Sequence, residues 1–176
     1  MFLKQWYQCL NTNMSGRTGN FKDVKGVTKS MFSTNKISIF DSSFDAYMGK
    51  VPPSMPYQGG AVFGTGNTPP TVNDYCLSGS VIDPSTGVKF VTNTNIEKSD
   101  NACTGTCEYT ITNNSGASIT IGEVGIAYPM ANGASSVSGE GVGLLERTAL
   151  ATPVTIAPGE VGKITYSITL DLSSLN

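Results

Sequence analysis

The residues of this sequence best suited to metal or redox chemistry are four cysteines: Cys9, Cys76, Cys103 and Cys107. Only Thr-Gly-Thr separates Cys103 from Cys107, and this spacing predicts a small disulfide loop over a turn. Two alternatives stay open. The four thiolates together could form a zinc site, or all four could be free thiols in a reducing cytosol.

Acid–base and nucleophilic chemistry is limited because none of the 176 residues is a histidine. This excludes Ser-His-Asp and Cys-His sites, and zinc or haem sites with imidazole ligands. No two carboxylates have a spacing that suggests general acid–base work. Glu123 falls in a strand-like segment, where a carboxylate needs a partner, so we expect a structural ion pair between Glu123 and Arg147. The sequence therefore predicts no enzymatic activity.

Gly64-Thr65-Gly66 is a glycine motif of the kind that can hold phosphate. No Gly-Lys-Ser/Thr follows it, and Pro69-Pro70 stands where the helix of a phosphate loop would begin. A tight turn accounts for both glycines. The acidic loop at Asp100 lacks the multi-carboxylate spacing of a calcium site. We therefore expect neither a cofactor nor a metal.

The composition limits the fold that positions these side chains. The chain is rich in Gly, Ser, Thr and Asn; 39% of its residues are apolar and 14% are charged. A run of about 18 apolar residues, as a membrane helix needs, is absent. Small polar and β-branched residues at low charge favour β-sheet, and the length fits one domain.

Charge is distributed unevenly along the chain. Residues 1–60 carry a net charge of +4, whereas residues 61–176 carry −6. The difference could be a chance property of a solvated surface, or the basic part could contact an acidic partner such as a neighbouring copy. The seven cations of residues 1–60 are spread singly, so nucleic-acid binding is not expected.

The first ten residues do not have the form of a secretory signal, since their apolar stretch is broken and no small-residue cleavage site follows. Their apolar residues fall near an i, i+3, i+4, i+7 pattern, which predicts a short amphipathic helix. This helix could pack on its own domain or dock onto another subunit. For docking, the expected assembly contacts are Phe2, Trp6 and Tyr7.

Turn-forming residues interrupt the rest of residues 1–60, which predicts an extended N-terminal arm and linker. Within it, residues 36–40 alternate as a strand does, and residues 49–60 combine stiff prolines with glycines as linkers do. Residues 61–176 are then expected to form a separate β-domain.

That second part alternates short apolar groups with turn signals. Strands are predicted at residues 61–63, 75–81, 87–92, 108–113, 119–128, 144–148, 153–156 and 164–172, with turns at 83–87 and 113–116, a bulge at Gly122 and a loop at 132–143. Such spacing is typical of an all-β protein. We expect an antiparallel β-sandwich of jelly-roll or immunoglobulin-like type.

Four motifs of this part occur in the same order in a group of tailed-bacteriophage virion proteins. They are GTG-x-T-x-P with D-Y-x-L (residues 64–77), TNNSG with E-x-G-I (112–126), LL-x-R-T (144–148) and P-V-x-I-x-P-G-E with I-x-Y-x-I (153–168). The chain therefore resembles virion proteins of the tail or head-decoration type. The resemblance spans about residues 61–172 and excludes the N-terminal part and the Cys103/Cys107 pair.

The resemblance implies a non-enzymatic structural protein of a tailed-phage virion, assembled in the host bacterial cytoplasm. We expect arm-mediated contacts on the capsid, neck or tail, with other virion proteins and with other copies of itself in a trimer or larger homo-oligomer. The alternative is an adhesion or carbohydrate-binding module at a fibre tip. Its candidate aromatic contacts are Tyr57, Tyr75 and Tyr128.

Overall fold

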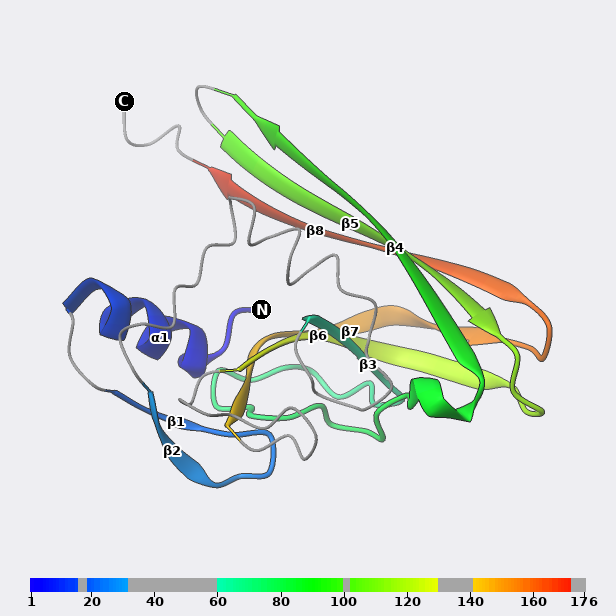
Figure 1. The fold of residues 1–176 in the computed structure, drawn as a ribbon, viewed down its shortest axis with the longest axis horizontal. Coiled ribbons are helices and arrows are strands. Elements are labelled where there is room, and N and C mark those ends of the chain that lie inside the picture. Colours follow the sequence, from blue (N-terminus) through cyan, green and yellow to red (C-terminus); the bar gives the residue numbers. More distant parts are fainter. Residues whose placement is uncertain (16–18, 32–59, 100–101, 130–140, 172–176) are drawn as a thin grey trace.

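The computed structural model describes residues 1–15, 19–31, 60–99, 102–129 and 141–171. In these ranges the chain is mostly β, with several antiparallel sheets and one short α-helix, so the predicted all-β class is confirmed at this level. Figure 1 shows two sheets one above the other, with the helix and a small hairpin beside the lower sheet.

Each of the two larger sheets has three strands, ordered β3-β6-β7 and β4-β5-β8, and all neighbours are antiparallel. The first sheet contains β3 (Gly60–Gly64), β6 (Ile119–Pro129) and β7 (Val142–Ile156). The second contains β4 (Val88–Lys98), β5 (Ala102–Asn113) and β8 (Val161–Asp171). The chain passes from one sheet to the other after β3, β5 and β7, so both sheets depend on contacts between distant parts of the sequence.

The main apolar core lies between these two sheets. Phe63 of β3 stacks on Phe90 of β4 with ring centroids 5.1 Å apart, and it meets Tyr109 of β5 edge-on at 5.1 Å. Alternate positions of all six strands supply the other buried side chains, among them Ile111, Ile121, Val124, Ile126, Ile156, Ile164 and Ile168. Since burial of one large apolar side chain contributes about 1.5–3 kcal/mol, this cluster holds the sheets face to face.

A second apolar cluster covers the opposite face of the first sheet. It joins Leu3 to Val62, Leu77, Ala127, Val142 and Leu144. The helix α1 (Lys4–Ser15) and the hairpin of β1 (Gly19–Lys22) and β2 (Thr28–Met31) lie on this side. Because Val62 points to this cluster and its neighbours Ala61 and Phe63 point to the main core, β3 is buried on both faces.

Residues 1–15 and 19–31 pack against the first sheet and do not project as an extended arm. Leu3 is fully buried, Trp6 is 9% exposed, and Phe2 stacks on Trp6 with centroids 5.0 Å apart. Val24 N–H donates to the carbonyl of Val142 at 2.9 Å. The amphipathic helix is confirmed, and it packs on its own domain. The predicted strand at residues 36–40 and nearly all of the predicted linker at 49–60 lie outside the described residues.

Residues 75–81, predicted as a strand, form a loop instead. The loop returns to β3, where Val81 makes a single bridge with Gly64. The strand prediction is wrong because the N–H groups of Ser78 and Gly79 donate to a carboxylate rather than to a neighbouring strand.

The β6–β7 pair differs from the prediction in one respect and agrees in another. The two short strands predicted at 144–148 and 153–156 are parts of the single strand β7. The predicted bulge is present, because the register of β6 on β7 shifts between Ile121 and Glu123. This shift reverses the alternation of the strand, so Ile121 and Val124 both face the main core and Glu123 faces away from it.

Candidate functional site

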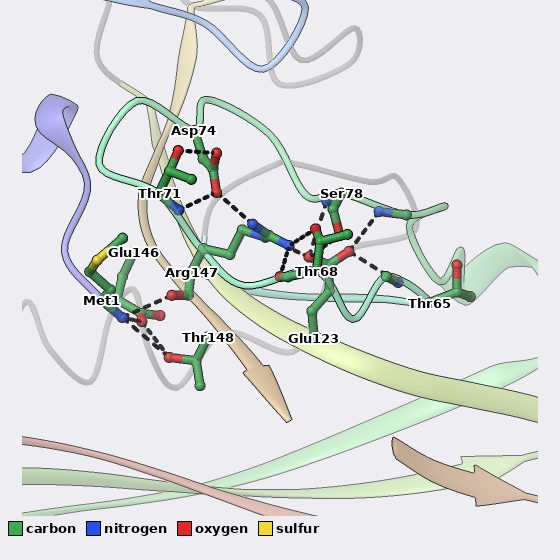
Figure 2. A network of polar contacts seen from close by, with 12 residues as sticks. Met1, Thr65, Thr68, Thr71, Asp74, Ser78, Glu123, Glu146, Arg147 and Thr148 are labelled. Atoms are coloured by element: carbon green, nitrogen blue, oxygen red, sulfur yellow. Dashed lines mark hydrogen bonds and ion pairs between the residues drawn. The ribbon is translucent and has the colours of Figure 1, made fainter. Parts of the chain in front are cut away.

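The most extensive polar cluster in the described residues surrounds the side chain of Arg147 on β7, which is 2% exposed (Figure 2). Its Nε donates to Glu123 Oε2 at 2.6 Å, and its Nη1 donates to Asp74 Oδ2 at 2.5 Å. Its Nη2 donates to the carbonyl and hydroxyl oxygens of Thr68, at 2.8 and 3.0 Å. The predicted ion pair of Glu123 and Arg147 is therefore present, with every guanidinium nitrogen bonded.

Glu123 is fully buried and binds the loop between β3 and β4. Its Oε1 accepts from the N–H groups of Gly66 and Gly79, at 3.1 and 2.7 Å. Its Oε2 accepts from the N–H and the hydroxyl of Ser78, at 3.0 and 3.2 Å, in addition to Arg147. The Glu123 carboxylate thus accepts backbone hydrogen bonds from two separate stretches of the loop, at Gly66 and at residues 78–79. In a sheet, a partner strand would accept such bonds.

Asp74 closes the other side of the cluster and is partly exposed. Its Oδ2 accepts from Thr71 N–H at 3.0 Å as well as from Arg147, and its Oδ1 accepts from the Thr71 hydroxyl at 2.7 Å. The loop residue Asp74 and the strand residue Glu123 therefore bind the same guanidinium, which fastens the loop to the sheet.

Hydrogen bonding sets the protonation state of all three charged groups. Burial alone would raise the pKa of Glu123 and of Asp74, but hydrogen bonds from loop backbone and from Arg147 outweigh it, so both pKa values lie below their ordinary range. Burial alone would lower the pKa of Arg147, and its bonds to Glu123 and Asp74 raise it instead. The cluster is ionised at neutral pH and holds no carboxylic acid able to donate a proton.

The glycines of this loop are required for close packing and not for a tight turn. A Cβ on Gly66 would lie 2.0 Å from Ser78 Oγ and 2.5 Å from the backbone nitrogen of Gly79. A Cβ on Gly122 would lie 2.5 Å from the carbonyl oxygen of Gly66. Neither Gly64 nor Gly66 has a positive φ. The turn prediction for this motif is replaced by a packing role.

A second polar node lies at the turn between β5 and β6. The buried side chain of Asn113 donates to the carbonyls of Ala117 and Ile156, at 2.8 and 2.9 Å, and accepts from Ser115 N–H at 3.0 Å. Its backbone N–H donates to Glu160 O at 3.0 Å. Asn113 thus joins the β5–β6 turn, the end of β7 and the β7–β8 turn.

Glu146 lines an open groove between β7 and β8, and it is the only carboxylate among the described residues that line it. Its Oε1 accepts from the Met1 ammonium group and from the hydroxyl of Thr148 (Figure 2). Burial, followed by the nearby Glu146 carboxylate, raises the pKa of Tyr166 in the same groove. Glycosidases typically have two carboxyl groups flanking the substrate, and the described lining of this groove contains one.

The predicted disulfide between Cys103 and Cys107 is wrong. Both residues lie within the regular part of β5, paired with Lys98 and Thr94 of β4. Four residues of extended strand span about 13 Å, whereas a disulfide needs Cα atoms within about 7 Å. Cys76 is a half-buried thiol whose pKa is raised by burial and then by the charge of Asp74. No group of three or more His, Cys, Asp or Glu within the described ranges could hold a metal ion.

The predicted contact residues have different positions. Trp6 and Phe2 pack within the chain, and Tyr7 is 58% exposed on α1, so of the three assembly contacts Tyr7 is the one available to a partner. Of the aromatic residues proposed for ligand binding, Tyr128 is buried and the ring of Tyr75 lies under Lys22 Nζ at 4.2 Å. Tyr57 lies outside the described residues.

Comparisons with protein-family models, with curated proteins and with solved structures find no match. Among the described helices, none has the length and apolar character needed to cross a bilayer.

Proposed function

We propose that this chain is a non-enzymatic structural component of a tailed-phage virion, built on the capsid, neck or tail in the host cytoplasm. One observation carries the proposal: the motifs that resemble virion proteins converge on the two polar nodes. Gly66, Thr68, Asp74, Glu123 and Arg147 all belong to those motifs and meet in one cluster. Asn113 and Glu160 belong to them too and meet in the other.

The closed character of both nodes favours a framework role over a catalytic one. In the first node, the Arg147 guanidinium and the Glu123 and Asp74 carboxylates are hydrogen-bonded to other groups of the protein. In the second node, the Asn113 amide is hydrogen-bonded to backbone carbonyls of the protein. A catalytic or binding site keeps polar groups directed at a vacant position. The resemblance is thus carried by residues that hold the fold together, as expected for proteins that work through shape and assembly.

The strand order supports an immunoglobulin-like sandwich over a jelly roll. An immunoglobulin constant domain has strands C, F and G in one sheet and A, B, E and D in the other. Strands β3, β6 and β7 correspond in order to C, F and G, and β4 and β5 correspond to D and E. β8 lies beside β5, as strand B lies beside strand E in the immunoglobulin sheet. Strand B precedes strand C along an immunoglobulin chain, whereas β8 is the last strand of this one. A jelly roll needs eight strands in two Greek keys, which this order does not form.

The adhesion alternative has less support. Sugar-binding modules present exposed aromatic faces, yet Tyr128 is buried and Tyr75 is covered by Lys22. None of the described residues provides specific support for a sugar-binding role. We therefore keep the structural role as the proposed function.

The test is to band the particles released from a host that carries the coding sequence on a density gradient and to search them by mass spectrometry. We expect this chain in the particle band at a fixed ratio to the other virion proteins, retained after washing in high salt. A matched Tyr7→Ala variant, which changes an exposed residue only, tests the assembly contact and should lower that ratio. Absence of the wild-type chain from washed particles would overturn the proposal.

A further inference from the structure

Both edges of the first sheet are covered by other parts of the same chain. The loop that precedes β4 pairs with β3, where Ile82 N–H donates to the carbonyl of Phe63 at 2.8 Å. The N-terminal residues pair with β7, where Leu3 N–H donates to the carbonyl of Leu145 at 2.9 Å. An uncovered edge offers unpaired N–H and C=O groups to another strand, and natural proteins cover or block such edges.

The outer edge of β4 has no cover of this kind in the described ranges. All 11 residues of β4 pair with β5, from Val88 opposite Asn113 to Lys98 opposite Cys103. No other backbone hydrogen bond between described residues reaches β4. Figure 1 shows β4 at the border of its sheet, with β5 on one side only. Between described residues this long edge therefore has no strand partner, and an edge of this kind is suited to accept a strand.

The outward-facing row of β4 is complementary to itself. It consists of Lys89, Val91, Asn93, Asn95 and Glu97, all exposed. An antiparallel copy placed with Asn93 at the centre brings Lys89 opposite Glu97 of the partner subunit, and the same ion pair forms a second time by symmetry. Opposite charges directly across a strand pair are favourable. Moving the register by two residues in either direction loses both ion pairs.

We propose that two copies of this chain pair through their β4 edges, antiparallel and centred on Asn93, to form one continuous six-stranded sheet. The contact is isologous, because the same edge is used on both subunits. The proposal rests on the proposed function in that it names one self-contact of a virion protein. Its structural basis is the open edge and the charge pattern of β4.

The other edge of the same sheet, on β8, is less suited to this pairing. Lys163 on its outward row is already bonded to Glu108 of β5 at 3.1 Å. The groove beside β8 is also lined by Met1 and Phe2 of the same chain. Self-pairing there would compete with contacts that the single chain makes.

A charge exchange tests the register. The mass of the full-length chain is measured by light scattering over a concentration series, and we expect a dimer for the wild type. Lys89→Glu places like charges opposite one another twice per dimer and should raise the dimer dissociation constant about tenfold. Glu97→Lys should do the same. The double variant restores opposite charges and should recover the wild-type constant, whereas Lys4→Glu on α1 changes the net charge equally and should have no effect.

Cysteine cross-linking tests the centre of the contact. In Asn93→Cys, the two new thiols lie directly opposite, at a Cβ separation of about 5 Å, so oxidation should give a covalent dimer. In Asn95→Cys, each new thiol faces Val91 of the partner subunit, and the two are offset by about 13 Å along the strands. This matched variant has one added thiol as well and should cross-link no more than the wild type.

Two results would overturn the edge pairing. One is a wild-type chain that stays monomeric at every concentration, and the other is equal cross-linking of Asn93→Cys and Asn95→Cys. Neither result bears on whether the chain is found in particles. Conversely, absence from particles would overturn the proposed function and leave the measured dimer intact, so the two failures are distinguishable.

Discussion

Arg147 and Glu123 lie on neighbouring strands two positions apart in register, since Arg147 pairs with Gly125, and their charged groups meet at 2.6 Å on the face turned away from the main core. The bulge at Gly122 sets this relationship. Without the bulge Glu123 would share the face of Ile121 and enter the apolar core. This local irregularity in the pairing of β6 with β7 thus creates the binding point for the loop between β3 and β4.

Removing the guanidinium should strongly destabilise the fold. Arg147→Met leaves the buried Glu123 carboxylate without its charged partner, and such a loss costs about 3–5 kcal/mol. The free energy of unfolding is measured in urea. Lys163→Met is the matched control, because it removes a cation from the exposed pair with Glu108 and should cost under about 1 kcal/mol. Equal losses in the two variants would contradict the structural role of Arg147.

Stability should fall in acid because of the same cluster. The folded-state pKa values of Glu123 and Asp74 lie below their ordinary values of 4.5 and 3.8. The unfolded chain therefore binds protons first as the pH falls, and stability that is complete above about pH 5 is lost progressively below it. Glu123→Gln should lower stability at pH 7 and flatten this dependence. Urea unfolding at a series of pH values measures both, and an unchanged slope in the variant would contradict the assignment.

The loop glycines give a prediction with an internal control. Gly66→Ala forces a Cβ to 2.5 Å from the backbone nitrogen of Gly79, so the loop must move away from Glu123. We expect a loss of about 1–3 kcal/mol. Gly116→Ala adds the same atom where nothing lies within 4 Å, and its unfolding midpoint should be nearly unchanged. Equal midpoints for the two variants would show that the close approach does not matter.

The sequence predicted the parts of the fold that depend on local pattern. A short apolar run located β3, alternation located β6 and β8, and the isolated Gly122 between two alternating groups located the bulge. It failed at residues 75–81, where the apolar pattern resembles a strand but the backbone binds the Glu123 carboxylate. That partner is distant in sequence, so no local pattern could reveal it.

The candidate site was predicted only in part, for a related reason. Glu123 in one strand-like segment and Arg147 in another suggested an ion pair, on the principle that a buried charge needs a partner. Asp74, Thr68 and Asn113 were missed as partners, because their roles depend on how loops return to the sheets. Their presence in the motifs was the one available signal. The disulfide failed because the turn assumed between Cys103 and Cys107 is continuous strand.

The second node should be as important for stability as the first. Asn113→Asp keeps the shape of the side chain but replaces the amide that donates to Ala117 and Ile156 with a carboxylate facing two carbonyl oxygens. Losing these buried bonds should cost at least about 2 kcal/mol at neutral pH. Asn114→Asp makes the same change at an exposed position and should be nearly neutral. Thermal unfolding compares the two, and similar midpoints would contradict the role of Asn113.

The docking of the N-terminal helix can be followed through Trp6, the single tryptophan of the chain. Leu3 is fully buried in the cluster beneath the helix, and Leu3→Ala should cost about 2–5 kcal/mol. Trp6 is 9% exposed in the folded chain. If the helix of Leu3→Ala undocks before the whole chain unfolds, Trp6 emission shifts to longer wavelength at a lower urea concentration than the one at which the β-sheet circular dichroism signal is lost. Tyr7→Ala alters the exposed side of the same helix and should leave both transitions in place. A red-shifted Trp6 in the native wild-type chain would show that these residues form a free arm after all.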